Sequence, residues 1–349
     1  MLRTYSPGAE VECRIDLSDN TNRWGIPPAA AAALRNLDPA ALTRYPSSYG
    51  DALKGAIATH LGIDVSNIVT GAGSDGVLEP AIRAFAQADG QMVLADPTFV
   101  MAAPFGRMNG LAPAGVPLLP SYDIDARAMV EAAGCVTYLC APNNPTGTSI
   151  TRDALDEVIA GAPGLVIIDE AYADFSASDA IELACTSDRV LVLRTLSKAF
   201  GLAGLRVGYG VGAPALVQAV EKARGPYTVN AVAERAAVAA LRDDAAWVAA
   251  RIGDAVAARE WLATELGALG LDPAPSEANF VFVPVADAAQ VAARMADAGV
   301  RVRAFDRLPA FTPALERSRG SALRITVAPA AELEPAVAAL RRALGGGDA

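Results

Sequence analysis

Lys198 is the residue whose surroundings best suit chemistry. The chain has only three lysines, and Lys198 alone follows an apolar run typical of a buried strand, residues 190–193. The hydroxyl of Ser197 precedes it directly, and the guanidinium of Arg206 follows eight positions later. A lysine held at a strand end between these groups suits the role of a Schiff-base amine beside a bound phosphate.

The stretch around this lysine is R-T-L-S-K-A-F-G-L-A-G-L-R, residues 194–206. It resembles the lysine motif of fold-type I pyridoxal-phosphate (PLP) enzymes, and within that superfamily it is most similar to the histidinol-phosphate aminotransferase branch. The resemblance implies that Lys198 forms the internal aldimine with PLP. Once displaced by a substrate amine, the lysine would move the Cα proton as general base and acid. The resemblance also implies that Thr195, Ser197 and Arg206 help to bind the cofactor, the arginine through its planar fork on the phosphate.

Two further motifs follow strand-like runs. Residues 143–147 are N-N-P-T-G, and residues 169–172 are D-E-A-Y. Taken alone, the first is an ordinary turn signal, and the aspartate of the second is a turn cap. In the family that they resemble, Asn144 contacts the cofactor's ring oxygen and the substrate carboxylate, and Tyr172 binds the same ring oxygen. Asp169 pairs there with the pyridine nitrogen and keeps it protonated, so that the ring can accept the electrons of the substrate carbanion.

The segment G-A-G-S-D-G at residues 71–76 follows a strand-like run and opens a helix. It matches the dinucleotide-binding fingerprint, with Asp96 twenty positions further on, so an NAD-dependent dehydrogenase is a genuine alternative. The same geometry also presents backbone N–H groups and a helix dipole to a single phosphate. The resemblance assigns Gly73, Ser74 and Asp75 to the phosphate end of PLP.

The remaining candidates carry over from the family one residue at a time. Phe99, in D-P-T-F, occupies the position of the aromatic side chain that stacks on the PLP ring. Tyr45, in R-Y-P, corresponds to a tyrosine that reaches the cofactor phosphate of the neighbouring subunit, which implies a homodimer with shared sites. Arg324 lies in an otherwise apolar strand-like run, where an arginine needs a partner, and matches the residue that binds the substrate α-carboxylate. Tyr5 and Arg303 match positions near the far end of the substrate, although a surface location suits them equally well.

These motifs need a scaffold in which strand ends lie together. Short apolar strands alternate with helices through the region before Lys198, which predicts a mostly parallel sheet covered by helices on both faces. In such α/β sheets ligands bind beyond the carboxyl ends of the strands, where the motifs fall. Long helices are predicted over residues 219–241 and 244–269.

The resemblance implies the PLP-transferase fold type I in three parts. Residues 1–35 would form an N-terminal arm and part of a small domain. Residues 36–245 would form the large PLP-binding domain, with a mostly parallel sheet of the seven-stranded type. Residues 246–349 would form the smaller α+β C-terminal domain.

Composition restricts the class of protein. The 349 residues carry a formal net charge of −10, and 52% are hydrophobic while 19% are charged. The acidic balance argues against a nucleic-acid partner. The sequence contains no run of ~18 uncharged apolar residues, so no membrane span is predicted. The N-terminus has no apolar signal core. Four cysteines without a C-x-x-C pair favour a reducing compartment, the cytoplasm. The single histidine, His60, excludes two-histidine metal sites and is typical of a helix C-terminal cation.

The sequence therefore predicts a PLP-dependent aminotransferase that moves an amino group from a small-molecule donor to a 2-oxo acid, with no metal site. Histidinol phosphate with 2-oxoglutarate, a step of histidine biosynthesis, is the expected substrate pair. Two segments depart from that branch where the substrate's distal group should lie. Residues 18–24 differ from its usual L-N-x-N-E-N-P, and residues 306–320 are longer than expected. Aromatic or other specialised amino acids therefore remain open as substrates, as does threonine-phosphate decarboxylation.

Overall fold

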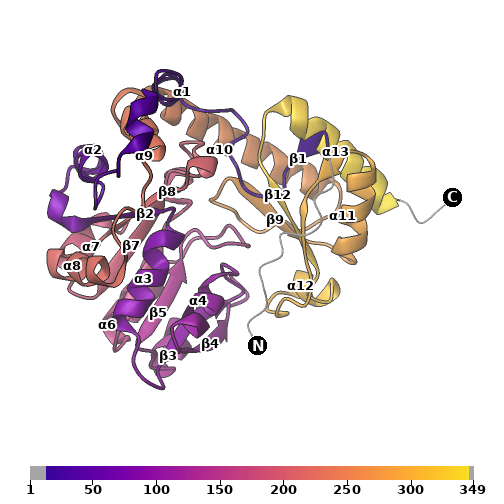
Figure 1. Ribbon diagram of the computed structural model, residues 1–349. Coiled ribbons are helices and arrows are strands. Elements are labelled where there is room, and N and C mark those ends of the chain that lie inside the picture. The colour runs from indigo at the N-terminus through magenta and orange to yellow at the C-terminus, as the bar shows by residue number, and fades with distance from the viewer. Residues whose placement is uncertain (1–12, 346–349) are drawn as a thin grey trace.

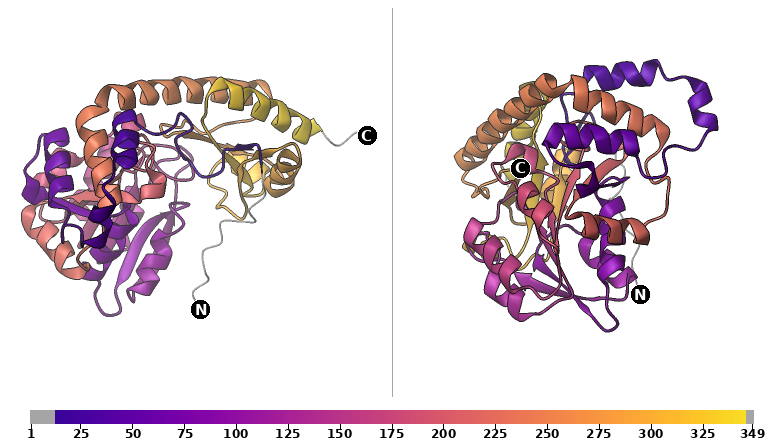
Figure 2. Two further views of the ribbon diagram at one scale, coloured as in Figure 1. Left: turned by 45° about the horizontal axis from the view of Figure 1, so that its top comes forward. Right: turned by 90° about the vertical axis from the view of Figure 1, so that its left-hand side faces the viewer.

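Two bodies of secondary structure, one built on a large sheet and one on a small sheet, lie side by side in this computed structural model (Figure 1). The structure describes residues 13–345. The longest described helix, α10 (Ala245–Ala268), runs along one side of the molecule from the large-sheet body to the small-sheet body (Figure 2). Among the described residues, no helix is both long and apolar enough to cross a membrane.

The large sheet has seven strands in the order β2-β8-β7-β6-β5-β3-β4. All neighbours run parallel except β8, which is antiparallel to both β2 and β7. The strands are β2 (Ile68–Ala72), β3 (Gln91–Asp96), β4 (Ala112–Pro117), β5 (Val136–Cys140), β6 (Leu165–Asp169), β7 (Val190–Thr195) and β8 (Val207–Val211). The predicted α/β architecture with a mostly parallel sheet is confirmed.

The central strands β5, β6 and β7 are buried over nearly their whole length. Their side chains alternate between two apolar cores, because successive residues of a strand point to opposite faces of the sheet. Val136 and Tyr138 pack in the same core as residues of α3 (Asp75–Phe85) and α8 (Pro214–Ala223), whereas Leu139 packs in the other core. A sheet covered on both faces requires continuous apolar strands of this kind.

Helices cover both faces of the large sheet, and one of them begins at the capping residue that the sequence predicts. Thr151 caps α6 by accepting a hydrogen bond from the backbone N–H of Ala154, as predicted. The other helices of this body are short or medium in length. They are α1 (Pro28–Arg35), α2 (Asp51–Leu61), α4 (Ala102–Met108), α5 (Ala126–Glu131), α6 (Arg152–Gly161), α7 (Ile181–Thr186) and α9 (Ala231–Asp243), with 3₁₀ turns at Pro39–Thr43, Val65–Asn67, Ala173–Phe175 and Ala203–Leu205.

The small-sheet body joins the two ends of the described chain. Its sheets are antiparallel β11-β12-β9 and parallel β1-β10. The Leu17 carbonyl accepts a hydrogen bond from the Thr326 N–H at 2.9 Å, so the N-terminal segment packs beside β12. The predicted domain boundaries after residues 35 and 245 stay a prediction. The elements are β1 (Ile15–Asp16), β9 (Phe280–Pro284), α11 (Ala288–Asp297), β10 (Val300–Arg301), β11 (Arg303–Phe305), α12 (Pro313–Arg317), β12 (Ala322–Thr326) and α13 (Ala330–Gly345).

One sequence-based expectation fails at a glycine-proline pair, and one glycine-rich strand is not predicted. The predicted helix over residues 219–241 is wrong, because Gly225 and Pro226 lie in a break between α8 and α9. Proline lacks a backbone N–H and disfavours helical geometry in the residue before it. Strand β8 is not predicted, because V-G-Y-G-V is rich in a poor strand former. Glycine is needed there, since a Cβ on Gly208 would lie 2.3 Å from the Gly73 carbonyl carbon.

The single histidine lies where the sequence predicts, in a partly buried environment that lowers its pKa. His60 occupies the last turn of α2, and its ring meets Phe200 edge to face with centroids 5.9 Å apart. Burial lowers the pKa of His60 below its ordinary value near 6.5. The predicted place in the last turn of a helix is confirmed, and the lowered pKa disfavours the predicted cationic form.

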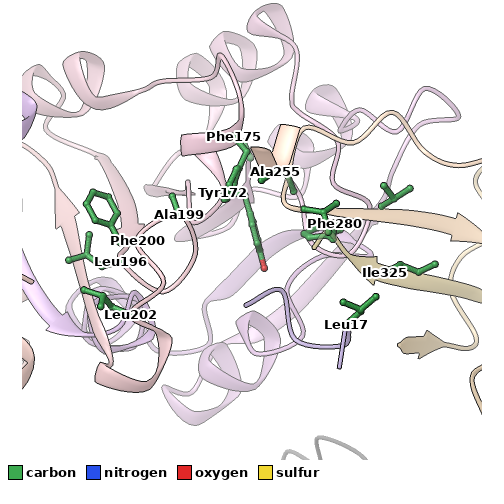
Figure 3. Close-up of a cluster of buried hydrophobic side chains, with 14 of the residues drawn as sticks. Leu17, Tyr172, Phe175, Leu196, Ala199, Phe200, Leu202, Ala255, Phe280 and Ile325 are labelled. Atoms are coloured by element: carbon green, nitrogen blue, oxygen red, sulfur yellow. The ribbon is translucent and has the colours of Figure 1, made fainter. Parts of the chain in front are cut away.

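An apolar cluster connects the two bodies. Figure 3 shows Tyr172 between Phe280 and the side chains of the loop after β7, including Leu196 and Ala199. The rings of Tyr172 and Phe280 meet edge to face with centroids 5.2 Å apart. Because Tyr172 follows β6 and Phe280 begins β9, this contact ties the large sheet to the small one.

Candidate active site

Side chains from the carboxyl ends of β5, β6 and β7 and from strands β11 and β12 line a cavity of about 550 Å³. Most of the site residues predicted from the sequence meet in it. They are Ser74, Asp75, Phe99, Asn144, Asp169, Tyr172, Thr195, Ser197, Lys198, Arg206, Arg303 and Arg324. Segments far apart in the chain thus contribute to one cavity, as the motif order predicts.

Lys198 presents a half-buried amine to this cavity. Its Nζ lies 5.4 Å from the centroid of the Tyr172 ring and donates a hydrogen bond to the Asp19 carbonyl oxygen at 3.4 Å. Burial, and after it the positive charge of Arg324, lowers the pKa of Lys198 to about 8, against the opposing charge of Asp19. A large fraction of the amine is therefore neutral near pH 8, as a nucleophile or proton acceptor must be.

Asp169 places a buried carboxylate at the end of β6. Its side chain is 4% exposed, and the Tyr138 hydroxyl donates to Oδ2 at 2.7 Å, while the Ala171 N–H donates to Oδ1 at 3.1 Å. Burial raises the pKa of Asp169 to about 6, and the Tyr138 hydrogen bond opposes that rise. The carboxylate is ionised at pH 7 and keeps acceptor capacity for a group in the cavity.

Tyr172 and Asn144 form a second polar group on the cavity wall. The Tyr172 hydroxyl accepts from Asn20 Nδ2 at 3.0 Å and from Asn144 Nδ2 at 3.5 Å. Burial raises the pKa of Tyr172 to about 12, so the phenol stays protonated at neutral pH. Its O–H is available to donate to an oxygen atom of a bound molecule.

Arg324 is held in one orientation by its surroundings. It is 8% exposed and donates to Asn144 Oδ1 and to the Ser18 carbonyl, both at 2.6 Å. Its guanidinium carbon lies 5.3 Å from the Phe280 ring centroid and 5.7 Å from that of Phe305. A guanidinium fixed in this way is preorganised to bind a carboxylate through two parallel hydrogen bonds.

The segment after β2 and the loop after β7 form a cationic cradle. Gly73 has a φ of +74°, and a Cβ on it would lie 2.6 Å from Arg206 Nη2, so glycine lets the guanidinium approach the backbone. Arg206 donates to Asp75 Oδ2 at 3.4 Å. The Thr195 hydroxyl donates to Ser197 Oγ at 2.9 Å beside it. Backbone N–H groups at the start of α3, hydroxyls and an arginine are the donors that a phosphate requires.

Two predicted site residues do not line this cavity, and a third lies outside the described residues. Gly73 is one of them, and its backbone lies against the guanidinium of Arg206. Tyr45 is 85% exposed and stacks on Tyr227, with ring centroids 5.0 Å apart. Tyr5 belongs to the part of the chain that the structure does not describe.

The sequence-based prediction misses several residues of the site, among them Asp19, Asn20 and Tyr138. Asp19 and Asn20 line the cavity, and the Tyr138 hydroxyl on β5 donates a hydrogen bond to Asp169 without lining the cavity itself. A signal existed for the first two, because residues 18–24 depart from the family pattern. For Tyr138 the signal is its period-two relation to Cys140, which lines the cavity at the end of the same strand.

The sheet order is incompatible with the dehydrogenase alternative. The glycine-rich segment follows β2, and Asp96 ends β3, but four strands lie between β2 and β3 in the sheet. The dinucleotide fingerprint requires the acidic residue within one compact βαβ unit, next to the glycine-rich turn. Asp96 therefore lies too far from the glycine-rich segment for that role.

The cofactor that the motifs imply fits the residues that are present. The cradle around Arg206 suits a phosphate, and the buried Asp169 carboxylate suits a protonated ring nitrogen. The Tyr172 phenol suits a ring oxygen, and the Lys198 amine suits an aldehyde. The donors and acceptors present are of the kinds that the groups of PLP require.

Comparison with known proteins agrees with this fit. Residues 14–340 match the family model described as aminotransferase class I and II. Histidinol-phosphate aminotransferase 1 of Nostoc sp. (strain PCC 7120) is 32% identical over 93% of this chain and 91% of its own. The aromatic amino acid aminotransferase of Rhodococcus jostii (strain RHA1) is 37% identical over 87% of each chain.

A solved structure of a PLP-containing aminotransferase has the same fold. Histidinol-phosphate aminotransferase from Sinorhizobium meliloti, in complex with pyridoxal-5'-phosphate, superposes with a TM-score of 0.84 at 27% identity, covering 96% of this chain and 92% of that one. The fold is PLP-transferase fold type I, the cofactor is PLP and the activity is transamination. The chain belongs to the class I and II aminotransferase family.

Proposed function

We propose that the protein transfers the amino group of histidinol phosphate to 2-oxoglutarate, a step of histidine biosynthesis, and that it works as a homodimer in the cytoplasm. Relatives that bear the histidinol-phosphate name support the proposal, at 32% and 35% identity over nearly their whole length. The roles of the individual site residues below belong to the same proposal.

One observation carries the choice of substrate: Arg303 lies directly opposite Arg324 in the register of β11 and β12, and both line the cavity. Directly opposite side chains of an antiparallel pair lie close together. An anionic substrate group at this place can therefore contact both guanidinium groups. A phosphate monoester offers three oxygens and up to two charges, which suits two guanidinium groups better than one carboxylate does.

The chain's own residues would divide the work as follows. PLP, when bound, supplies the electron sink that stabilises a substrate carbanion. Asp169, ionised at pH 7, holds the proton on the ring nitrogen, and Tyr172 with Asn144 binds the ring oxygen. Lys198 carries the proton to and from the substrate Cα, a transfer that its pKa near neutrality favours.

The test is a comparison of amino donors with 2-oxoglutarate as acceptor. We expect kcat/KM for histidinol phosphate to exceed that for phenylalanine. Arg303→Gln should lower the histidinol-phosphate value by roughly ten- to a hundredfold, since it removes a hydrogen bond to a charged group, and change the phenylalanine value little. A higher kcat/KM for phenylalanine, with histidinol phosphate insensitive to Arg303→Gln, would overturn the proposed substrate and leave the transaminase in place.

Transamination of aromatic amino acids is the second candidate, and the acidic side of the cavity favours it. Asp19 and Asp306 are exposed carboxylates that line the cavity, and they repel a phosphate dianion more than an amino acid without net charge. Phe99 and Phe305 add aromatic walls. In the same assay, Asp19→Asn and Asp306→Asn should raise kcat/KM for histidinol phosphate and leave that for phenylalanine unchanged.

A further inference from the structure

We propose that Tyr138 is a positioning residue of the transaminase site, whose hydroxyl orients the Asp169 carboxylate toward the ring nitrogen of PLP and keeps it ionised. The inference rests on the proposed role of Asp169. Tyr138 belongs to none of the motifs. Its side chain is fully buried and does not line the cavity, which it reaches only through Asp169.

The register of the sheet brings the two residues together. Cys140 pairs with Asp169 between β5 and β6, and Tyr138 precedes Cys140 by two positions on the same strand. Residues two apart on a strand share a face. Tyr138 therefore lies on the face from which Cys140 and Asp169 reach the cavity, and its hydroxyl donates to Asp169 Oδ2 at 2.7 Å.

The hydroxyl can act only as a donor to this carboxylate. Tyr138 is 0% exposed, and burial together with the Asp169 charge raises its pKa well above 10. Burial and the Asp169 charge likewise raise the pKa of the neighbouring Cys140 thiol well above its ordinary value. Of the other charges facing Asp169, Asp75 favours its protonated form and Lys198 its ionised form. Tyr138 is thus the side-chain donor that most favours the Asp169 carboxylate against the effect of burial.

Loss of this bond would change the cofactor's electronic state. A carboxylate that accepts one charge-assisted hydrogen bond fewer is more basic and less firmly oriented. The proton that it shares with the PLP ring nitrogen would then lie closer to Asp169. The ring would be a weaker acceptor of the substrate's electrons, whereas the contacts that bind the substrate would be unchanged.

The experiment uses Tyr138→Phe in the holoenzyme loaded with PLP labelled with ¹⁵N at the ring nitrogen. We expect the ¹⁵N resonance to move from the protonated toward the neutral pyridine value, and kcat to fall by roughly ten- to a hundredfold with KM little changed. Tyr209→Phe is the matched control: it removes a buried phenol hydroxyl from strand β8, which β7 and β6 separate from β5, outside the cavity lining, and should leave the resonance in place.

A double-mutant comparison separates the possible failures. If Asp169→Asn moves the resonance and Tyr138→Phe does not, Tyr138 has no positioning role. If Asp169→Asn itself leaves the resonance unchanged, the role of Asp169 is wrong and this inference falls with it. If both single variants move it, Tyr138→Phe should add nothing in the Asp169→Asn background. A further shift there would mean that Tyr138 acts by another route, which would also overturn the inference.

Discussion

At the residue scale, burial sets the protonation states of the two ionisable side chains that the proposed reaction needs. Lys198 and Asp169 lie in the same cavity, and burial shifts both pKa values toward neutrality, to about 8 and about 6. Between these two values the lysine is largely protonated and the aspartate ionised. The pH of the solution therefore controls each of them separately.

The first prediction concerns the loading of PLP onto the apoprotein. Only the neutral amine of Lys198 can attack an aldehyde, and its pKa is about 8. The rate of loading should rise about tenfold per pH unit below pH 8 and level off above it, as followed by the visible absorption of the bound cofactor. In Lys198→Ala no such band should form. A rate that keeps rising to pH 10 would mean that the amine has an ordinary lysine pKa.

The second prediction concerns Asp169→Asn. A charge pair at ~4 Å in an effective dielectric of about 20 contributes roughly 4 kcal/mol, and each 1.36 kcal/mol is tenfold in rate. We expect kcat to fall about a thousandfold in steady-state assays. Asp96→Asn, at the end of strand β3 and outside the cavity, serves as the control and should retain near wild-type kcat. Near wild-type turnover in Asp169→Asn would contradict the assignment of this carboxylate.

At the element scale, an ion pair fixes the ends of β6 and β7 relative to each other. Glu170 follows β6 and is 2% exposed, and Arg194 on β7 binds its carboxylate at 2.7 Å. The arginine also lies 3.4 Å from Asp179 and 3.9 Å from Asp174. The ion pair therefore stabilises the two strand ends that carry Asp169 and the Lys198 loop.

The third prediction is that Arg194→Met destabilises the fold. It leaves a buried carboxylate without its cation, a change that typically costs about 3–5 kcal/mol in the free energy of unfolding. Urea unfolding of the holoenzyme should report this loss, and Arg194→Met/Glu170→Gln should recover part of it. Arg127→Met removes the exposed ion pair with Glu131 and should produce no measurable change. Equal effects of the two single variants would show that burial of the Glu170–Arg194 pair does not matter.

At the scale of the whole molecule, the tyrosine of R-Y-P lies away from the cavity that it is expected to serve. Tyr45 is 85% exposed and stacks on Tyr227, and Leu42, three positions earlier in the chain, is 58% exposed. An exposed aromatic cluster of this kind is typical of a surface that another protein covers. In the proposed homodimer a second copy covers it, and Tyr45 enters the partner's site.

The fourth prediction tests this arrangement by mixing subunits. Tyr45→Ala should lower the affinity for PLP by about tenfold, through loss of one hydrogen bond to a charged phosphate. Lys198→Ala removes the amine from the other end of the site. Heterodimers of the two variants would contain one intact site each. At a PLP concentration too low to load Tyr45→Ala, an equal mixture should therefore regain activity that neither variant shows alone. No recovery in a mixture shown to exchange subunits would rule out a shared site.

The resemblance of the motifs to a known enzyme family predicted PLP, the fold type and most of the cavity residues, and the strand-helix pattern predicted where those residues meet. Lys198, Asp169 and Asn144 each follow a strand, and the carboxyl ends of parallel strands meet at one edge of a sheet. The meeting of these residues follows from local patterns, an apolar run and then a polar side chain, whereas their roles come from the resemblance. The same local reading failed at residues 219–241, where a helical pattern of apolar residues outweighed a single glycine-proline pair.

Tertiary structure decided the contacts that depend on register and on the meeting of distant segments. The bond from Tyr138 to Asp169 requires β5 and β6 to pair without a shift, and the opposition of Arg303 to Arg324 requires the same of β11 and β12. A slip of one residue would send these side chains to opposite faces. Asn20 reaches Tyr172 only because the N-terminal segment packs beside β12. Sequence patterns describe one element at a time, whereas these contacts depend on how two elements are aligned in space.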